Sequence, residues 1–408
     1  MKNLKKIFFS ASFCVFSGII FSQTKITLET AIETAFKNNS LLKSERLKSD
    51  YQKQLIKSSL TIAPIAISGD YGQINSFYND TKFGISQTLN FPSVYSNQKK
   101  VFKEEWEASI LNVSLKESEL KKAVTQRFYT LIYLNEKQKL LQKSDSIYAE
   151  FIKKSEIRFK KGESNILEKT TAQTQQGTIK MQLLQLQQEQ ETVQLQFQLL
   201  LNDEQVFVPN SKALKLEFDQ IKDSTLISKH PNLKLFEQYK KVSQANTKLE
   251  KSKLLPSFTI GYNNNSFIGN GADNLVYDKS NRFHSAQIGL GIPLFGGWQK
   301  AKINASKIAE NISDNEFQNL KKATQNKYKL LLFEHQKNGE KIAYFEKTAL
   351  PNAKIIEETA NKQFFNGDIN YLDWTMLFNQ SIALKSNYID TISVYNQTII
   401  ELNYLLSK

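Results

Sequence analysis

The stretch 288-IGLGIPLFGGWQKAKI-303 changes its hydrophobic pattern half-way along. Its first five residues alternate between large apolar side chains and glycine, which is the period of a β-strand with two different faces. Pro293, Gly296 and Gly297 then interrupt the pattern, and from Trp298 the apolar residues follow the spacing of a helix. The sequence therefore predicts a strand that leads almost directly into a helix.

The same junction occurs a second time, because the second half of the chain repeats the first. The segment 83–101 has the same layout, with a proline again between strand and helix. We therefore predict two structural repeats, 23–210 and 211–408, each ordered helix, proline, strand, loop, strand, proline, long helix, glycine, helix. The matched positions are Pro64 with Pro256, Pro92 with Pro293, and Gly162 with Gly367.

Four segments are predicted as strands, near 65–73, 81–91, 257–267 and 284–292. Each has about the length of a tilted strand that crosses a membrane, roughly 9–11 residues. A half-buried strand of a soluble sheet is the alternative for each segment taken alone. In lipid, four strands are too few to close a sheet, and an open edge leaves backbone groups unpaired. A membrane sheet would therefore need strands from several chains.

Long helices account for most of the remaining chain, so we predict a mainly α fold with a small β part. The segment 96–159 contains neither proline nor glycine and would form a rod of about 96 Å. The matching segment 298–364 contains Pro351, where we expect a kink or break. Apolar residues in the first segment follow alternating steps of three and four, as in a coiled coil, interrupted by the polar residues Glu117, Arg127 and Gln138. The apolar positions are Trp106, Ile110, Val113, Leu120, Val124, Leu131, Leu134 and Leu141.

Two similar motifs, RFKKGESNILEK and QFFNGDINYLDW, separate the long helices. Each glycine suits the left-handed position that ends a helix, and each asparagine can cap the next helix. The acid three residues after the asparagine matches a capping box, and it also places charge at an exposed tip. The motif residues are Gly162, Asn165 and Glu168 in the first tip, and Gly367, Asn370 and Asp373 in the second.

Residues 1–22 have the three-part pattern of a secretory signal peptide. Three lysines precede an apolar run from Ile7 to Phe21, and the small residue Ser22 follows. The chain's one cysteine, Cys14, lies within this segment, and the residues before it do not match a lipidation signal. We therefore predict an exported, non-lipidated mature chain without cysteine, which excludes disulfides, thiol nucleophiles and thiolate metal sites.

The remaining composition argues against several function classes. The formal charge of +14 includes three signal lysines and is typical of a solvated polar surface, so no nucleic-acid partner is predicted. We find no motif of a hydrolase, metalloprotease or nucleotide-binding enzyme. His230, His284 and His335 are far apart, and we expect them at surface or capping positions rather than as metal ligands. No cofactor and no metal site are predicted.

With these features the chain resembles the TolC-like outer membrane efflux proteins, from about Thr27 to Leu406. The resemblance implies a homotrimer in the outer membrane of a Gram-negative cell, in contact with its lipid. Each subunit would give four strands to a twelve-stranded β-barrel, and the helices would form a trimeric α-barrel through the periplasm. It also implies two partners at the helical tips, a periplasmic adaptor protein and an inner-membrane pump. The family's members are channels, so the chain is not expected to be an enzyme.

The family's tip pattern has an aromatic residue three positions before the glycine, then a hydroxyl residue and an acid. Asparagine replaces the hydroxyl residue in both tips and keeps the capping ability. The resemblance implies adaptor contact or a gate at Phe159, Gly162, Asn165, Glu168, Phe364, Gly367, Asn370, Tyr371 and Asp373. It implies membrane-to-periplasm joints at Pro64, Pro92, Pro256, Pro293, Gly296 and Gly297.

Within the family, GLGIPLFGGWQKAKINASKI and LLPSFTIGY are most similar to the outer membrane components of heavy-metal efflux systems of the resistance-nodulation-division type. This similarity implies heavy-metal cations as the exported substrate. Multidrug efflux and type I protein secretion are the alternatives within the family. A soluble coiled-coil scaffold is a further alternative, but it does not account for the strands.

Overall fold

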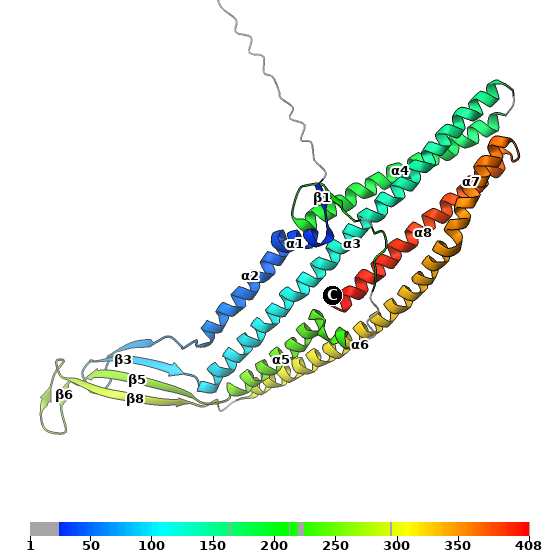
Figure 1. Ribbon diagram of the computed structural model, residues 1–408. Helices are drawn as coiled ribbons and strands as arrows, with labels where there is room; N and C mark the ends of the chain where they lie inside the picture. The colour runs from blue at the N-terminus through cyan, green and yellow to red at the C-terminus, as the bar shows by residue number, and fades with distance from the viewer. Residues whose placement is uncertain (1–23, 163–164, 212, 219–223, 294–295, 408) are drawn as a thin grey trace, which may run out of the picture.

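The computed structural model describes residues 24–162, 165–211, 213–218, 224–293 and 296–407. The predicted signal peptide, 1–22, lies outside the described residues. The molecule is elongated, with a sheet at one end and long helices over the rest of its length (Figure 1). The predicted mainly α fold with a small β part is therefore confirmed. The division into repeats at residue 210 stays a prediction.

The sheet has four strands, and the four predicted segments are confirmed. They are β2 (Ala66–Gly72), β3 (Asp80–Leu89), β5 (Ser257–Ser266) and β8 (Arg282–Gly291). The strand order is β2-β3-β5-β8, and every neighbouring pair is antiparallel. The connection between β5 and β8 carries a small hairpin of β6 (Gly269–Asn270) and β7 (Val276–Tyr277).

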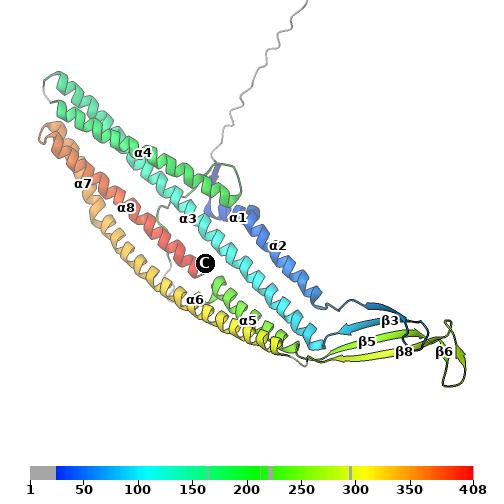
Figure 2. The same ribbon diagram turned by 180° about the vertical axis from the view of Figure 1, so that it is seen from behind.

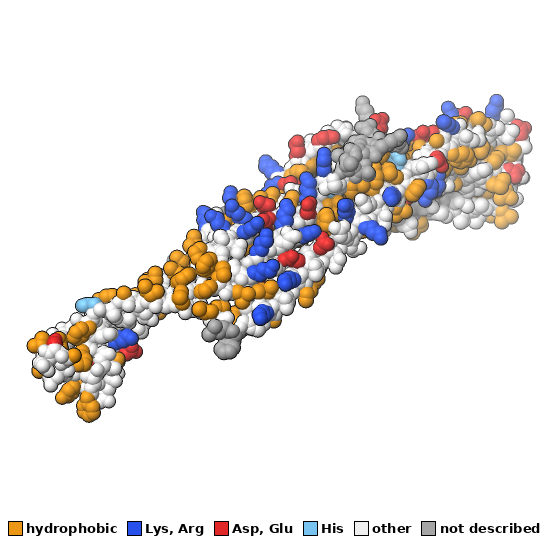
Figure 3. Space-filling view, turned by 90° about the horizontal axis from the view of Figure 1, so that it is seen from below, with side chains coloured by type: hydrophobic (Ala, Val, Ile, Leu, Met, Phe, Trp, Pro, Cys, Tyr) orange, Lys and Arg blue, Asp and Glu red, His pale blue; other side chains and the backbone are white. Residues whose placement is uncertain are grey.

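The register gives this sheet one apolar face and one polar face. Ile85 pairs with both Ile67 and Tyr262, and Ile260 pairs with Ile288, so these residues share a face. Ile67 is 80% exposed and Ile288 is 84% exposed, although a monomeric soluble protein rarely exposes such a contiguous apolar patch. The opposite face carries mainly serine, threonine, asparagine and glycine. Figure 3 shows hydrophobic side chains over this end and charged ones over the helical body.

The first helical hairpin is formed by α3 (Pro92–Lys160) and α4 (Ile166–Leu201). At 69 residues α3 is about 104 Å long, and it begins at Pro92, because proline fits the first turn of a helix. The helix α2 (Ser40–Leu55) runs beside it and leads through a short turn, η1 (Ile56–Ser59), toward β2.

The predicted coiled-coil seam of α3 is confirmed only in its middle. Leu120, Val124, Leu131 and Leu134 are buried, whereas Ile110 is 42% exposed, so its prediction was wrong. Near the sheet α3 turns a different stripe inward, because it packs there against α5 (Pro231–Ser252). The buried residues of that stripe are Val101, Ala108 and Leu115, which contact Leu235, Ala245 and Leu249 of α5.

The second long hairpin contains the expected disruption at Pro351. It consists of α6 (Gly297–Tyr344), a π-helical turn η3 (Phe345–Ala349), α7 (Leu350–Asn366) and α8 (Tyr371–Leu405). The wide π turn stands just before the proline, which falls in the first turn of α7 and has no N–H to donate. The path curves here rather than breaks, as the view from behind shows (Figure 2).

A small group of short elements lies beside the middle of the long helices. The strand β1 (Thr24–Ile26) pairs in parallel with β4 (Phe207–Pro209), and α1 (Leu28–Asn38) packs on α3. The short helix η2 (Ser224–Lys229) leads into α5. The largest buried cluster lies here and includes Val124, Phe128, Leu134, Phe197 and Leu201. Within the described ranges, no helix is both long and apolar enough to cross a membrane.

Candidate functional site

The first tip lies where α3 turns into α4. Gly162 has φ of +76°, the left-handed conformation that glycine adopts without strain. The side chain of Asn165 accepts a hydrogen bond from the N–H of Glu168 at 3.1 Å and so caps α4. The predicted glycine turn and asparagine cap are both confirmed.

The second tip has the same construction. Gly367 has φ of +85°, and the N–H of Asp368 donates to the carbonyl of Gln363 at 2.9 Å, which closes the end of α7. The side chain of Asn370 accepts from the N–H of Asp373 at 2.9 Å and caps α8. Local hydrogen bonds therefore fix the helix ends on either side of both tips.

The two acids of the tips differ in their surroundings. The Glu168 side chain is 12% exposed, and its carboxylate contacts α3 through Arg158 at 3.5 Å and Ser155 at 3.4 Å. The Asp373 carboxylate is half-buried and makes no hydrogen bond or ion pair with the described residues, so the capping box expected in the second tip is incomplete. Asp373 thus carries the less compensated negative charge.

An aromatic cluster joins the two hairpins just behind the tips. Phe151 of α3 lies between aromatic rings of α7 and α8: it stacks on Trp374 at 4.6 Å between ring centroids and lies 5.0 Å from Phe364. Trp374 also stacks on Phe378 at 5.1 Å, and its indole N–H donates to Asn361 at 2.8 Å. These contacts fix the first hairpin against the second.

The sequence analysis did not single out this cluster. A signal was present, since Trp374 and Phe378 stand four residues apart and therefore share one face of α8. The two aromatic residues of the tip motifs also differ from each other. Phe364 is buried in the cluster, whereas Phe159 is 41% exposed.

Tyr371 lies between the two tips. Burial raises the pKa of its phenol, and the nearby Glu168 carboxylate adds to this rise, so the phenol stays protonated at neutral pH. A hollow of about 660 Å³ opens beside it, lined by both tips, including Arg158, Phe365 and Asp368. The tips thus enclose a polar cleft at the far end of the rod.

The predicted joints lie at the opposite end of the helices, beside the sheet. Pro92 begins α3, and Pro256 stands directly before β5. Pro64 lies between η1 and β2, and Pro293 stands two residues after the end of β8. Gly296 is the N-cap of α6 with φ of −76°, and Gly297 is its first residue, so neither position needs a left-handed glycine. The residues mark sheet-to-helix transitions, and their role at a membrane surface stays a prediction.

The three histidines lie apart from each other in three different settings. His230 caps α5 by accepting the N–H of Asn232 at 3.2 Å, as predicted, and His284 lies on the exposed sheet. For His335 the prediction was wrong: its ring is buried, stacks on Tyr395 at 4.9 Å and accepts or donates a 2.9 Å hydrogen bond there. The described residues hold no group of three histidine or acidic side chains placed to bind a metal ion.

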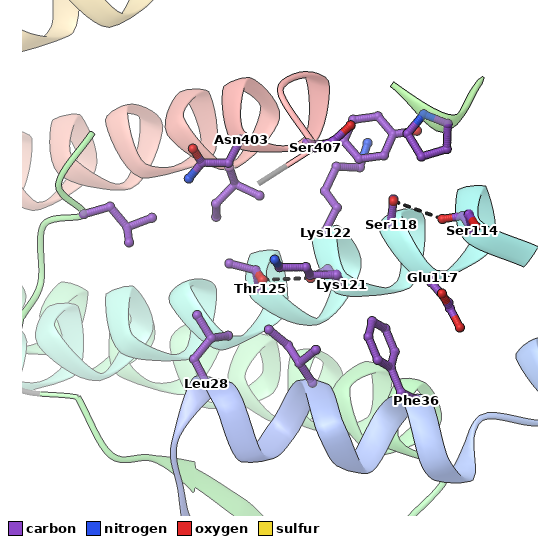
Figure 4. Close-up of a pocket in the computed structure, with 15 residues that line it drawn as sticks. Leu28, Phe36, Ser114, Glu117, Ser118, Lys121, Lys122, Thr125, Asn403 and Ser407 are labelled. Carbon is purple, nitrogen blue, oxygen red and sulfur yellow. Dashed lines mark hydrogen bonds between the residues drawn. The ribbon is translucent and has the colours of Figure 1, made fainter. Parts of the chain in front are cut away.

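A groove of about 480 Å³ between α1, α3 and α8 was not anticipated (Figure 4). Its wall on α1 is apolar, and its α3 wall carries Ser114, Ser118 and Lys122. Both serine hydroxyls donate to backbone carbonyls of their own helix. Lys122 pairs with Glu401 at 3.1 Å and lies over the Tyr404 ring at 4.3 Å. Neither of these two serine hydroxyls therefore donates to a basic side chain.

Comparison with known proteins gives matches in structure but not in sequence. No family model matches the chain, and no curated protein matches it. CusC, a protein that forms a transmembrane channel, superposes with a TM-score of 0.78 at 16% identity, covering 93% of this chain and 91% of its own. The chain has the fold of the TolC-like outer membrane channels. OprN, an outer membrane channel, gives a TM-score of 0.80 at 13% identity, covering 93% of this chain and 89% of its own.

The CmeC outer membrane channel of Campylobacter jejuni gives the same result. Its TM-score is 0.77 at 14% identity, and the match covers 100% of this chain and 93% of CmeC. All three proteins are therefore channels. The shared fold therefore spans nearly the whole of this chain and of each of the three channels.

Proposed function

We propose that this chain forms the outer membrane duct of a tripartite efflux system. The observation that carries the proposal is the open four-stranded sheet with one exposed apolar face, joined to helices about 100 Å long. The apolar face would meet lipid, and the helices would extend through the periplasm. Solved channels of the same fold support this arrangement.

Three copies would close the sheet into a barrel. Within the described residues β2 and β8 each have one edge without a partner strand, and lipid does not tolerate open edges. Because neighbouring strands alternate in direction, β8 of one subunit would run antiparallel to β2 of the next. A trimer would then form a twelve-stranded antiparallel barrel whose polar face lines the pore.

The tips would form the periplasmic mouth and contact the adaptor and pump. Their distance from the sheet favours this role, because the full length of the long hairpins separates the two (Figure 1). Three copies each of Asp373, Glu168 and Tyr371 would surround the mouth. We propose that Asp373 acts there in cation attraction or closure, because its charge is the less compensated.

Heavy-metal cations are the proposed substrate. The sequence around the second joint supports this choice through its similarity to heavy-metal efflux components. A passive duct needs no cation site of its own, since selectivity can reside in the pump. Multidrug efflux and type I protein secretion remain the competing substrates for the same duct.

Two measurements test the proposal. Membrane fractionation should find the chain as a heat-sensitive trimer in the outer membrane, whereas a coiled-coil scaffold would be in the soluble fraction. A deletion strain should become sensitive to zinc, cobalt, cadmium, nickel, copper or silver, and the intact gene should restore growth. Sensitivity confined to detergents and dyes would overturn the metal substrate and leave the duct.

A further inference from the structure

A fixed cation stands at the far end of the apolar face of the sheet. Arg282, the first residue of β8, donates from Nε to the Asn264 side chain at 2.6 Å and from Nη1 to the Thr81 hydroxyl at 2.7 Å. Its Nη2 donates to the backbone carbonyl of Asn264 at 3.2 Å, and its guanidinium lies 5.5 Å from the centre of the Phe83 ring. Contacts from β3 and β5 therefore hold the guanidinium in one orientation.

None of the residues that the structure describes neutralises this charge. The three acceptors of Arg282 are a side-chain amide, a hydroxyl and a backbone carbonyl, all uncharged. No carboxylate among the described residues lies within ion-pair distance of it. A guanidinium has five N–H donors, so two are left for a ligand. A planar fork with two free donors and a full positive charge fits a phosphate oxygen pair.

Arg282 lies on the apolar face and not on the polar one. Along β8 it shares its face with His284, Ile288 and Leu290, and on β3 with Phe83. Lys82 of β3 lies within one residue of the same height along the strands, but on the opposite face of the sheet. It stands opposite Asp70 of β2 in the strand register. The two basic residues thus face different environments.

The height of Arg282 matches the outer boundary of a membrane. The strand β8 is 10 residues long, about 34 Å, and at a tilt of about 40° it would rise about 26 Å from the joint. The apolar band of an outer membrane barrel is about 25 Å tall. A charge facing lipid is costly at the centre of that band and nearly free at its edge. Arg282 would therefore lie at the level of lipid headgroups.

Neighbouring side chains have the character of such a boundary. Tyr262 and His284 stack at 5.9 Å, and the phenol contacts Nδ1 of the imidazole. The amide of Asn264 lies 3.2 Å from the same nitrogen. Amphipathic rings of this kind are enriched where membrane meets water. The apolar surface of the sheet thus gives way to hydrogen-bonding side chains toward the end of the strands that lies away from the helices.

We propose that Arg282, with Asn264, Thr81 and His284 around it, binds the phosphate of a phosphorylated lipid headgroup in the outer leaflet. Three copies would place one such site on each subunit of the barrel. The proposal rests on the proposed function, because it requires the apolar face to meet lipid with the helices on the periplasmic side. The site would fix the barrel's height and rotation in the outer leaflet.

The experiment uses the purified full chain in detergent and counts bound lipid by native mass spectrometry. The probe is diphosphoryl lipid A, compared with the same lipid after removal of both phosphates. We expect the wild-type protein to bind the phosphorylated form about ten-fold more tightly, from the charged hydrogen bonds gained. Inorganic phosphate at the same concentration should not displace the lipid, because it lacks the acyl chains. Equal binding of both lipids, or displacement by phosphate, would overturn the proposal without any variant.

Two variants locate the site. R282Q should lose most of the preference for the phosphorylated lipid, whereas K82Q removes a positive charge at the same level of the opposite face and should keep it. An equal loss in both variants would point to general charge attraction and contradict a built site. Single-channel conductance in planar bilayers separates the two proposals: a conducting protein without lipid A preference refutes this inference alone, and a protein that never conducts refutes both.

Discussion

The indole ring of Trp374 stacks on the phenyl ring of Phe151, with 4.6 Å between centroids and 11° between planes. One residue lies on α8 and the other on α3, so the contact joins the two helical hairpins of the subunit. Tyr148 adds an edge-on contact with the same indole at 5.7 Å. A cluster so close to both tips holds the mouth of the proposed duct in one arrangement.

Trp374→Ala should therefore separate the hairpins and lower the free energy of unfolding by about 3–5 kcal/mol, because it leaves a large cavity among buried rings. Trp374→Phe should recover most of the loss. Urea unfolding followed by far-UV circular dichroism measures both. Met376→Ala is the matched control, since Met376 is 63% exposed on the same helix and should change stability by less than about 0.5 kcal/mol. A similar loss in the control would show that the effect is not specific to the cluster.

Replacing glycine by alanine should change the stability of the fold in opposite directions at two positions, the turn of the second tip and the middle of α4. Gly367 has φ of +85°, so Gly367→Ala should destabilise by about 1 kcal/mol. Gly177 is exposed within α4, and an added Cβ there would meet no atom within 4 Å. Gly177→Ala should therefore stabilise by about 0.5–1 kcal/mol. Thermal unfolding of the two variants tests the pair, and a shift of the same sign in both would contradict it.

Local chemistry accounts for what the sequence could predict. A period of two located all four strands, and the capping ability of Asn165 and Asn370 located both tips, because these signals act within a few residues. The Trp374–Phe151 stack depends on two helices far apart in sequence, so no local pattern contains it. His335 was missed for the same reason, since its burial comes from Tyr395 on α8 and from Phe218.

His230 predicts a loss of stability in mild acid. Burial lowers the pKa of its ring to about 4, below the ordinary value of 6.5. In the unfolded chain the His230 ring is therefore protonated as the pH falls below about 6.5, whereas in the folded chain it is protonated only near pH 4. The stability that depends on a neutral His230 ring is fully present above pH 6.5. It is lost as the pH falls toward 4, by at most about 1.4 kcal/mol per pH unit.

His230→Asn keeps a capping side chain but does not titrate. Urea unfolding of wild type and variant at several pH values measures the difference between them. That difference should change between pH 6.5 and 4 and be constant above pH 7. Parallel stability curves across the whole range would show that His230 is not the titrating group.

We predict a second pH dependence of the free energy of unfolding, at lower pH, from Glu357 of α7. Burial alone would raise the pKa of its carboxyl, but the hydrogen bonds and charges of Lys385 and Lys143 outweigh burial and hold the pKa below 4.5. Its stabilising contribution is therefore present above pH 4.5 and lost as the pH falls through the lowered pKa. Glu357→Gln should cost about 1–3 kcal/mol at pH 7 and little in strong acid.

The neighbouring residue provides a control for this ion pair. The Glu358 side chain is 68% exposed and lies 3.9 Å from Lys354, so Glu358→Gln should change stability by less than about 0.5 kcal/mol. Unfolding at pH 7 and near pH 3 measures both variants. An equal effect of the two substitutions would mean that net charge, and not the buried contacts of Glu357, is responsible.

Asp373 predicts a change in ion selectivity. Its carboxylate has no cationic partner among the described residues, and a trimer would bring three copies to one mouth. Uncompensated charges in a narrow opening raise the local concentration of cations. Asp373→Asn should therefore lower the cation preference of single-channel currents in planar bilayers, and Asp373→Arg should lower it further. Glu358→Gln, which removes an exposed charge on α7 outside the cleft between the tips, is the matched control and should have the smaller effect. Unchanged conductance, selectivity and export in both Asp373 variants would exclude a role for this residue at the mouth.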